Sequence, residues 1–344
     1  MTIVDAHIHV SNIKDSFKPV YDLAKRLNYS KLAVLSLQCT GNLLQNLTCA
    51  LCKALNPDIT YAFGGLDYTT GRDALSQVQN LRALGFDGIK MLEGKPTVRR
   101  ELGHALSDPV FYDYFKYLEE TSFPVLLHMA DPPEFWDKNK VPSWAVEQGW
   151  FYNESDVPYR QYYDEVEKVL DNHPKLQAIF AHFYFLSDDP DKAQKFLDDH
   201  PSIFIDVTAG IEMYENFSKD PDFWREFFIK NDRRIIFGTD SSDAELLPED
   251  TGPDDKVDIR GYAAMEIDFL RSNKEIKVFD KIINGIGLPE SSQKLIFSEN
   301  YYSLVGTEPK RLDIPALKEE AAFIRGFLQT EEDKETLDYI VSTI

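Results

Sequence analysis

Short apolar runs rich in β-branched residues alternate along the chain with stretches whose apolar residues recur every three or four positions. The first pattern is typical of buried strands and the second of amphipathic helices. The helical spacing is clear, for example, at Val20, Leu23, Ala24 and Leu27. Eight strands are predicted, at residues 3–10, 31–37, 60–66, 88–92, 124–128, 177–182, 203–207 and 234–238. This alternation predicts an α/β fold with a parallel sheet.

Eight such units fit a closed (β/α)8 TIM barrel, which typically needs about 250 residues. Residues 129–160, after the fifth strand, are rich in aromatic residues and prolines, and residues 241–258, after the eighth, are rich in acids. Long insertions at these places are often lids or binding loops, although 129–160 could also be a small packed subdomain. We predict a barrel over 1–309 that includes the insertion, a closing helix over 289–305, and a C-terminal helical extension over 310–344.

The chain carries a formal charge of −21. Such a charge repels nucleic acid and anionic membranes, so we expect neither as a partner. The chain shows neither a long apolar span nor a basic leader followed by an apolar stretch, and we therefore expect a cytoplasmic protein. We expect Cys39, Cys49 and Cys52 to be buried free thiols, because no second Cys or His pair lies near the Cys-x-x-Cys. A small-molecule substrate and a homodimer are also expected.

The candidate chemistry begins in the first strand, where two histidines lie two residues apart. Side chains alternate across a strand, so Asp5, His7 and His9 are predicted to share one face, opposite a face of apolar residues. Two neutral imidazoles on one rigid face can ligate a divalent metal. The alternative is a half-buried strand with incidental histidines. Which of the two holds depends on whether other strands supply further metal ligands.

Three other strands supply partners. His128 and His182 end the fifth and sixth predicted strands, and Asp240 follows the eighth. The C-terminal ends of barrel strands meet on one side, where these side chains would gather. An acid there can bind a metal and accept a proton from a metal-bound water, although it could instead cap a helix. Of the remaining histidines, His173 and His200 lie in turn segments and are expected at the surface, and His104 lies in an irregular polar segment with no strand behind it.

Lys90 lies within the apolar fourth strand, where an unpaired charge is costly, so it must meet an anion or lose its charge. Imidazoles with a carboxylate suit Zn²⁺, Mn²⁺, Fe²⁺ or Ni²⁺ better than Mg²⁺ or Ca²⁺, and Zn²⁺ is the expected ion. Such an ion lowers the pKa of a bound water from about 15.7 towards 7 and polarises a carbonyl. Asp240 would then steer that water and shuttle its proton.

Five segments in this order resemble the amidohydrolase superfamily, particularly its amidohydrolase 2 group of TIM-barrel hydrolases: Asp5-Ala6-His7-Ile8-His9, Gly88-Ile89-Lys90, Leu127-His128, Ala181-His182 and Gly238-Thr239-Asp240. The resemblance implies metal ligation by His7, His9 and Asp240, with His128 and His182 as further ligands or catalytic histidines. Lys90 matches a carboxylated lysine that bridges two metals in some members, whereas His182 contacts the substrate in one-metal members. One or two ions therefore remain open.

The same group contains decarboxylases and lactone-cleaving enzymes, so the fold does not choose the reaction. The leading hypothesis is a hydrolase of a small, carboxylate-bearing amide, lactone or ester, with Asp240 as general base and His182 and Lys90 as further catalytic residues. A metal-dependent, non-oxidative decarboxylase and a non-catalytic barrel scaffold are the alternatives. The bulky Phe183-Tyr184-Phe185 replaces the small residues that many relatives have after His182, which weakens analogies about the substrate.

Three residues are predicted to bind substrate. Arg99 and Arg100 lie just past the fourth strand, and arginine recognises carboxylates by paired hydrogen bonds. A solvated loop is the alternative for both. Trp136 belongs to the aromatic insertion, which is expected to exclude water and hold the body of the substrate.

Overall fold

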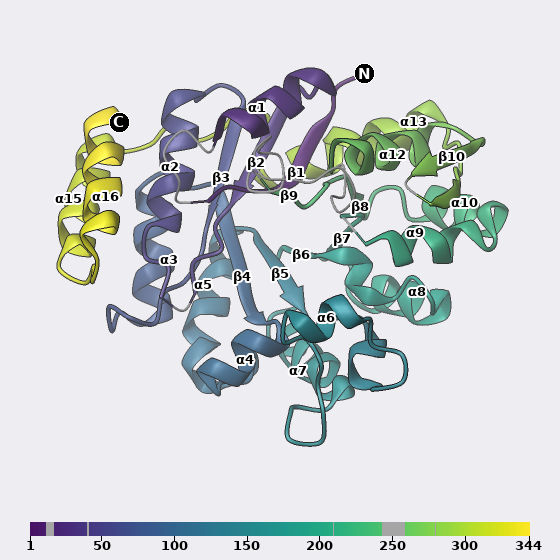
Figure 1. Ribbon diagram of the computed structural model, residues 1–344, viewed down its shortest axis with the longest axis horizontal. Coiled ribbons are helices and arrows are strands. Elements are labelled where there is room, and N and C mark those ends of the chain that lie inside the picture. The colour runs from purple at the N-terminus through teal and green to yellow at the C-terminus, as the bar shows by residue number, and fades with distance from the viewer. Residues whose placement is uncertain (12–16, 40, 209, 243–258, 279) are drawn as a thin grey trace.

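Nine strands form one parallel sheet in the order β8-β7-β6-β5-β4-β3-β2-β1-β9 (Figure 1). The computed structural model describes residues 1–11, 17–39, 41–208, 210–242, 259–278 and 280–344. The strands are β1 (Val4–His9), β2 (Lys31–Leu35), β3 (Thr60–Gly64), β4 (Gly88–Gly94), β5 (Val125–Met129), β6 (Ala178–Phe180), β7 (Phe204–Asp206), β8 (Ile235–Ile236) and β9 (Ser241–Ser242). All eight predicted strands are therefore confirmed.

β8 and β9 are two halves of the eighth barrel strand. β8 pairs with β7, and β9 pairs with β1. Between the two halves, the amide of Ala6 donates to the carbonyl of Phe237 at 3.1 Å. The eighth strand thus joins β7 to β1, and the predicted TIM barrel is confirmed. Ser241 and Ser242 form a strand where the sequence predicted the start of a loop; the rest of that predicted loop, 243–258, lies outside the described residues.

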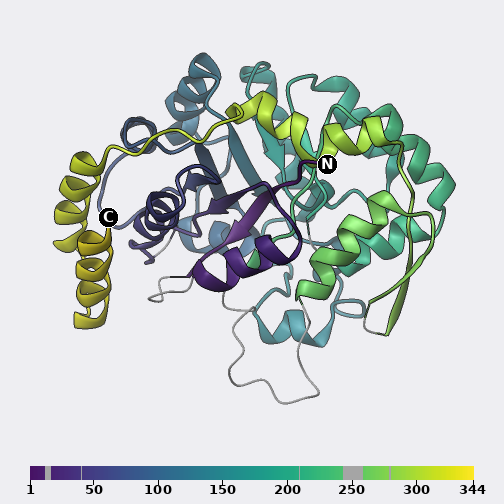
Figure 2. The same cartoon turned by 90° about the horizontal axis from the view of Figure 1, so that it is seen from above.

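Helices cover the outside of the sheet, and Figure 2 shows them around the strands. They are α1 (Phe17–Arg26), α2 (Gln45–Leu55), α3 (Ala74–Ala83), α4 (Pro96–Leu102), α5 (Tyr112–Thr121), α7 (Tyr159–Asn172), α8 (Pro190–Asp199), α9 (Ile211–Ser218), α10 (Pro221–Lys230) and α12 (Ile259–Arg271). Asp189 and Asp220 cap α8 and α10, each directly before a proline at the first helical position. Each aspartate accepts a hydrogen bond from a backbone amide of the first turn, which has no partner within the helix, and each proline fixes the φ angle at the helix start.

An apolar cluster fills the end of the barrel interior that lies next to α14 (Asn300–Val305). It includes six residues from five strands: Val4, Ala6, Leu35, Leu126, Ile179 and Ile236. Tyr301 of α14 closes this end, with its ring 5.2 Å from that of Tyr61. His9 at the end of β1, His128 near the end of β5 and Asp240 after β8 place polar side chains at the C-terminal ends of the strands. α14 follows α13 (Glu290–Lys294) and a π-helical turn (Leu295–Glu299), which confirms the predicted closing helix.

The predicted insertion is present between β5 and α7. It contains η2 (Pro133–Trp136) and α6 (Ser143–Glu147). Phe135, Ala145 and Tyr152 form a small apolar cluster of its own, separate from the two barrel clusters. Trp136 packs against both this cluster and the main core. The insertion is therefore a small packed unit attached to the barrel.

The C-terminal extension consists of α15 (Ile314–Arg325) and α16 (Glu331–Thr343), which lie at one edge of the molecule beside α2 and α3 (Figures 1 and 2). Arg72 anchors α15 through Glu320 at 2.6 Å. The backbone amide of Lys310 donates to Asp87, a buried carboxylate that also pairs with buried Lys53. The sequence did not predict the hairpin of β10 (Glu275–Val278) and β11 (Lys281–Asn284).

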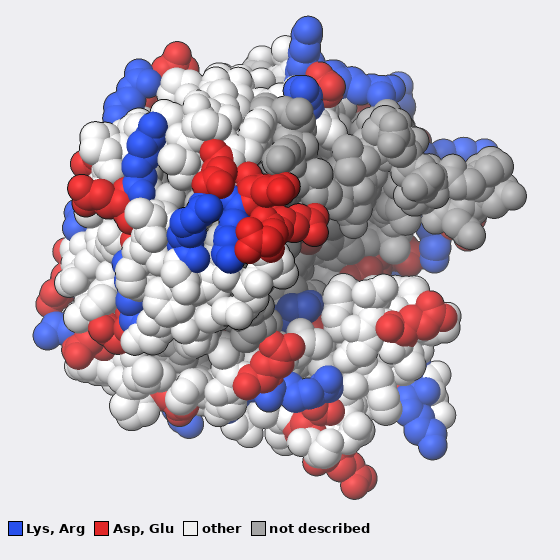
Figure 3. Space-filling view, turned by 60° about the vertical axis from the view of Figure 1, so that its left-hand side comes forward, with Lys and Arg blue, Asp and Glu red and all other residues white. Residues whose placement is uncertain are grey.

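Several smaller predictions can also be compared with the structure. The three cysteines are buried and form no disulfide among the described residues, as expected. His104 is exposed and His200 is half-buried, but His173 is buried beside Phe115, so its prediction as a surface residue is wrong. Within the described ranges, no helix has the length and apolar character needed to cross a membrane. On the face in Figure 3, charged side chains of both signs lie in small groups between uncharged surface.

Candidate functional site

A bulge in β1 sets the direction of its polar side chains. Between Asp5 and Ile8, β1 contains one residue more than the paired stretch of β2. An extra residue reverses the alternation of side chains across the strand. Asp5 and Ile8 therefore face the outer helices, whereas His7 and His9 face the barrel interior. The prediction that Asp5 shares a face with the two histidines is wrong for this reason.

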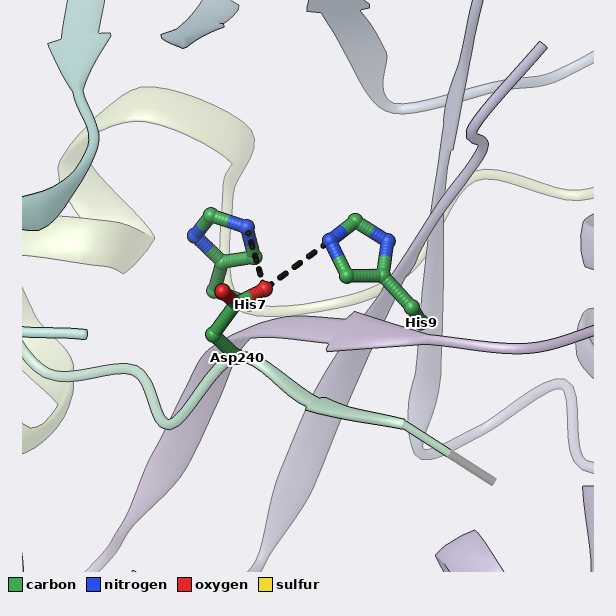
Figure 4. A group of neighbouring side chains, drawn as sticks. All are labelled: His7, His9 and Asp240. Atoms are coloured by element: carbon green, nitrogen blue, oxygen red, sulfur yellow. Dashed lines mark ion pairs between the residues drawn. The ribbon is translucent and has the colours of Figure 1, made fainter. Parts of the chain in front are cut away.

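His7, His9 and Asp240 form a compact group at the C-terminal ends of the strands (Figure 4). The Oδ1 atom of Asp240 lies 3.2 Å from Nε2 of His7 and 3.0 Å from Nε2 of His9. One ligand atom from each residue lies within 4.8 Å of the others. The structure thus brings together the three ligands that the resemblance implied.

The hydrogen bonds of the two imidazoles fix which nitrogen can bind a metal. Nδ1 of His7 lies 2.9 Å from the carboxylate of Asp206, and Nδ1 of His9 lies 2.9 Å from the carbonyl of Leu35. Both partners are acceptors, so each Nδ1 carries the proton, and a neutral ring then has its lone pair on Nε2. Burial, followed by the charge of Lys90, lowers the pKa of His7 to about 4. His7 is therefore neutral at pH 7.

This donor set fits a divalent transition metal. The Nε2 atoms of His7 and His9 and the Oδ1 atom of Asp240 converge without a proton from the His7 ring between them. Burial alone would raise the pKa of Asp240, but His7, His9 and His182 outweigh it and hold the pKa well below its usual range. Two imidazole nitrogens and a carboxylate oxygen are the ligands of many Zn²⁺ sites with an open position.

The backbone around Asp240 is adapted to this position. Asp240 has a φ of 53°, in the left-handed region, where the eighth strand is interrupted. A Cβ at Gly238 would lie 2.9 Å from Cβ of His7, so only glycine permits this close approach. The amide and hydroxyl of Thr239 donate to Asp5 on the outer side of β1. Asp5 thus holds the turn that presents Asp240.

Lys90 faces the same group from β4. Its Nζ atom lies 3.0 Å from Nε2 of His7, and the side chain is buried. Burial lowers the pKa of Lys90 to about 8, although Asp240 and Asp206 counteract part of this effect. A pKa of about 8 leaves most of the amine charged at pH 7, so Lys90 keeps its charge and meets the first of the two expected outcomes: the anions are Asp240 and Asp206.

His128 and His182 form a hydrogen-bonded pair next to this group. Nε2 of His182 lies 3.1 Å from Nδ1 of His128, and the ring centroids of His182 and His7 are 5.7 Å apart. Nδ1 of His182 contacts the hydroxyl of Thr208, and Nε2 of His128 contacts Asp131. In the described part of the chain, neither histidine belongs to the compact group formed by His7, His9 and Asp240. Their roles as ligands stay predictions.

His182 begins a strained turn. All four residues of η3 (His182–Phe185) have φ between 51° and 59°. Left-handed backbone costs roughly 1–2 kcal/mol per non-glycine residue, and such strain concentrates at functional sites. Aromatic packing holds the turn, because Phe183 lies against Phe217, Trp224 and Phe228. The bulky segment noted after His182 therefore fixes the histidine in place.

Sequence reasoning missed several buried acids. Asp206 at the end of β7 accepts hydrogen bonds from His7 and from the backbone amide of His182. Asp206 could have been predicted from the sequence, because it lies near the end of the predicted strand 203–207. Glu266 of α12 is fully buried, and neither of its carboxyl oxygens has a hydrogen-bond partner among the described residues. Burial, and then the charge of Asp5, raises the pKa of Glu266 well above its usual value.

The predicted substrate residues lie beside the insertion and have partners within the protein. Arg99 pairs with Glu165 at 3.4 Å, and Arg100 pairs with Asp156 at 2.9 Å. The indole nitrogen of Trp136 donates to the carbonyl of Val157. Their contact with a substrate stays a prediction.

A hollow of about 390 Å³, open to solvent, lies beside His182. Its lining includes Phe185 and three carboxylates, Glu134, Asp188 and Glu212. Carboxylates that line the same hollow disfavour a further anion there, although burial raises the pKa of Glu212 and weakens its share of this effect. This side of the site therefore favours neutral or cationic groups of a bound molecule.

Asp206→Asn is expected to weaken Zn²⁺ binding about 10–100-fold, because the acceptor that orients His7 is lost while the ligands remain. Competition with a chromogenic chelator measures the affinity. Asp199→Asn, at an exposed position, is the matched control and should leave the affinity unchanged. Equal affinities for the wild type and Asp206→Asn would contradict the assignment.

The fold and the site define a class of protein: a (β/α)8 barrel with a candidate metal centre of two histidines and one aspartate at the C-terminal ends of its strands. The chain belongs to the amidohydrolase family, whose model matches residues 4–300. This is a family of metal-dependent enzymes. A comparison with curated proteins gives no match.

Solved structures share the fold at low sequence identity. An uncharacterised TIM-barrel protein from Bordetella bronchiseptica is 12% identical, with a TM-score of 0.55, and the match covers 89% of this chain and 99% of that one. A manganese-bound dihydroxybenzoic acid decarboxylase from Polaromonas sp. is 12% identical, with a TM-score of 0.52 and coverage of 88% and 96%. 4-Oxalomesaconate hydratase from Rhodopseudomonas palustris is 13% identical, with a TM-score of 0.51 and coverage of 94% and 99%. These likenesses establish the barrel fold.

Proposed function

We propose that this protein is a metal-dependent hydrolase of a small amide, lactone or ester that carries a carboxylate, with a divalent ion held by His7, His9 and Asp240. The observation that carries the proposal is the convergence of two Nε2 atoms and one carboxylate oxygen, with both Nδ1 protons committed elsewhere. Membership of the amidohydrolase family supports a metal-dependent enzyme. The described residues offer one group of three ligands, which supports one ion. A second ion would require Lys90 in a carboxylated form.

Zn²⁺ is the proposed ion, since two imidazoles and a carboxylate match its usual ligands. Fe²⁺ and Ni²⁺ accept the same ligands, and Mn²⁺ has a precedent in the manganese-bound decarboxylase from Polaromonas sp.. Elemental analysis of the purified protein, after expression with each metal, identifies the ion. Less than about half an equivalent of any transition metal would contradict the enzymatic proposals and favour a non-catalytic scaffold.

When bound, a divalent ion activates water as a nucleophile and polarises the carbonyl under attack. Asp240 accepts the proton: both imidazole contacts go to Oδ1, which leaves Oδ2 for this task. Lys90 places a mostly protonated amine 3.0 Å from Nε2 of His7, where its charge also interacts with Asp240 and balances the negative charge that develops. These roles use only groups that already face the barrel interior.

In this proposal the histidine pair takes up a further proton only during turnover, because burial lowers the pKa of both rings and leaves them neutral otherwise. Thr208 has one hydroxyl proton for two acceptors, Nδ1 of His182 at 3.0 Å and Oδ1 of Asp206 at 2.7 Å. An additional proton on Nδ1 of His182 satisfies both contacts at once. We therefore assign His182 and His128 to proton storage during turnover, as the general acid for the leaving group.

Arg99 is the better of the two predicted arginines for binding a substrate carboxylate. Its Nε and Nη1 atoms are buried without a hydrogen-bond partner among the described residues. Arg100, in contrast, is half exposed and pairs closely with Asp156. Buried donors without an acceptor are costly, and a substrate carboxylate would satisfy them. Trp136 would form the apolar wall of the same region.

A metal-dependent, non-oxidative decarboxylase is the second candidate, favoured by the fold shared with the decarboxylase from Polaromonas sp.. An oxygen-18 experiment separates the two reactions. The metal-loaded protein is screened against carboxylate-bearing amides, lactones, esters and hydroxybenzoates, and any substrate is then turned over in labelled water. Hydrolysis is expected to place one labelled oxygen in the organic product. Release of CO₂ with an unlabelled organic product would overturn the hydrolase proposal in favour of the decarboxylase.

A further inference from the structure

The hollow beside His182 is lined by three carboxylates, whereas no lysine or arginine lines it among the described residues. Glu134 comes from η2 of the insertion, Asp188 from the turn after η3, and Glu212 from the first turn of α9. In the part of the chain that the structure describes, none of the three carboxyl groups forms an ion pair or a hydrogen bond with another residue. The negative charge of this lining is therefore not balanced by the residues around it.

The backbone of Gly210 leaves room for the carboxyl group of Glu212. A Cβ atom at Gly210 would lie 2.7 Å from Oε1 of Glu212, and Gly210 has a φ of 144°. Glycine adopts such a φ readily and leaves this space empty. Glu212 is half-buried, and burial, with a smaller contribution from the charges of Glu134 and Glu215, raises its pKa. A positively charged group in the hollow would offset these unfavourable effects.

Phe185 adds an aromatic wall to the same hollow. It ends the left-handed turn, and its ring centroid lies 5.3 Å from that of His182. The face of an aromatic ring attracts ammonium and guanidinium groups, and the attraction is stronger where water is excluded. Among the described residues, the three carboxylates do not form a compact group of ligand atoms like that of His7, His9 and Asp240. The lining therefore suits an organic cation better than a metal ion.

The hollow lies next to a second one of about 630 Å³, and the two share part of their lining, including Asp188. Phe223, which is 45% exposed, lines the second hollow. Lys219 and Asp220 also line it and bring opposite charges. The two hollows thus lead from the surface to His182, and the unbalanced negative charge is concentrated at the inner one.

We propose that the hollow beside His182 binds an organic cation, an amine or guanidinium group that is protonated at pH 7, and that the substrate carries such a group. The inference rests on the proposed function in so far as that function places the reaction next to His182. It adds a positive group to the carboxylate proposed for the substrate. The substrate class is then a zwitterionic amide, lactone or ester, such as a derivative of an amino acid.

Matched pairs of small carboxylates test the proposal on the full-length, Zn²⁺-loaded protein. Each pair is an ω-amino acid, from β-alanine to ε-aminocaproate, and the fatty acid in which a methyl group replaces the ammonium group. The carboxylate is the same in both members, so any difference in Kd reports on the ammonium group. Ligand-observed NMR titration measures each Kd. For the chain length that fits, the amino acid is expected to bind at least about 10-fold more tightly, as is usual for hydrogen bonds to charged groups.

Glu134→Gln and Asp188→Asn are each expected to reduce this preference for the amino acid, because each removes one negative charge from the hollow and keeps the shape of the side chain. Glu147→Gln is the matched control: it makes the same change at an exposed position on α6 of the same insertion. It should retain the wild-type preference. Circular dichroism of each variant confirms that the fold is kept.

The proposal is refuted if no amino acid of the series binds more tightly than its partner, whether both bind equally or neither binds. It is also refuted if Glu134→Gln and Asp188→Asn both keep the full wild-type preference. The titration needs neither substrate nor turnover. Failure of the hydrolase assignment would therefore leave the binding result intact, and failure of the binding result would leave the oxygen-18 result intact.

Discussion

Replacement of His9 by alanine is expected to lower the affinity for Zn²⁺ by at least about 100-fold, since loss of an outer partner of a ligand alone typically costs 10–100-fold. His9 supplies one of three converging ligand atoms, and the carbonyl of Leu35 holds its Nε2 atom towards Asp240. Chelator competition measures the affinity directly. Excess Zn²⁺ should also raise the melting temperature of the wild type more than that of the variant, because binding to the native state adds RT ln(1 + [Zn²⁺]/Kd) to its stability.

The matched control is His104→Ala. It removes an exposed imidazole that does not belong to the group of His7, His9 and Asp240. Its Zn²⁺ affinity should equal that of the wild type. An unchanged affinity in His9→Ala would show that the ion is held elsewhere. In that case the ligand roles predicted for His128, His182 and Lys90 would become the leading assignment.

Asp240→Asn is expected to reduce kcat by about 10²–10⁴-fold, the usual range for the loss of a general acid or base. The substitution removes the negative charge and the proton acceptor and keeps the shape of the side chain. Turnover should be measured with saturating Zn²⁺, so that weaker metal binding does not account for the loss. With the ion bound, the remaining effect reports on proton acceptance by Asp240.

Asp199→Asn makes the same chemical change at an exposed site on α8 and should leave kcat unchanged. A metal-loaded Asp240→Asn protein that keeps more than about a tenth of the wild-type kcat would rule out Asp240 as the base. Nδ1 of His182, which contacts Thr208, would then be the next group to test.

The sequence predicted the strands well because apolar runs between helical stretches leave few alternatives to a β/α barrel. It also predicted that His7, His9 and Asp240 converge, since they lie at strand ends that the barrel brings together; their role as metal ligands stays a prediction. What it missed depends on tertiary detail. The bulge in β1 turns Asp5 away from the histidines, and the alternation of polar and apolar residues in the sequence does not reveal it. The partners of Arg99 and Arg100 are 66 and 56 residues away in the chain.

The acids around the site show the same limit. Asp206 and Asp131 resemble any other acid at the end of a strand, and only the fold shows that they accept hydrogen bonds from His7 and His128. The hairpin of β10 and β11 consists of short strands, half exposed, next to a helix, where periodicity is a weak guide. Local pattern therefore predicted the elements, and long-range contacts decided their chemistry.

The interruption of the eighth strand has a consequence for biosynthesis. His9 and Asp240 come from opposite ends of the barrel sequence, and β9 pairs with β1 to close the ring. Until β9 has left the ribosome, the side of β1 that does not pair with β2 is an open sheet edge, and such edges favour aggregation. The ion site cannot form before that closure, so metal uptake would follow, and stabilise, the completed barrel. Zinc retention would then serve as an assay for correctly folded molecules in a preparation.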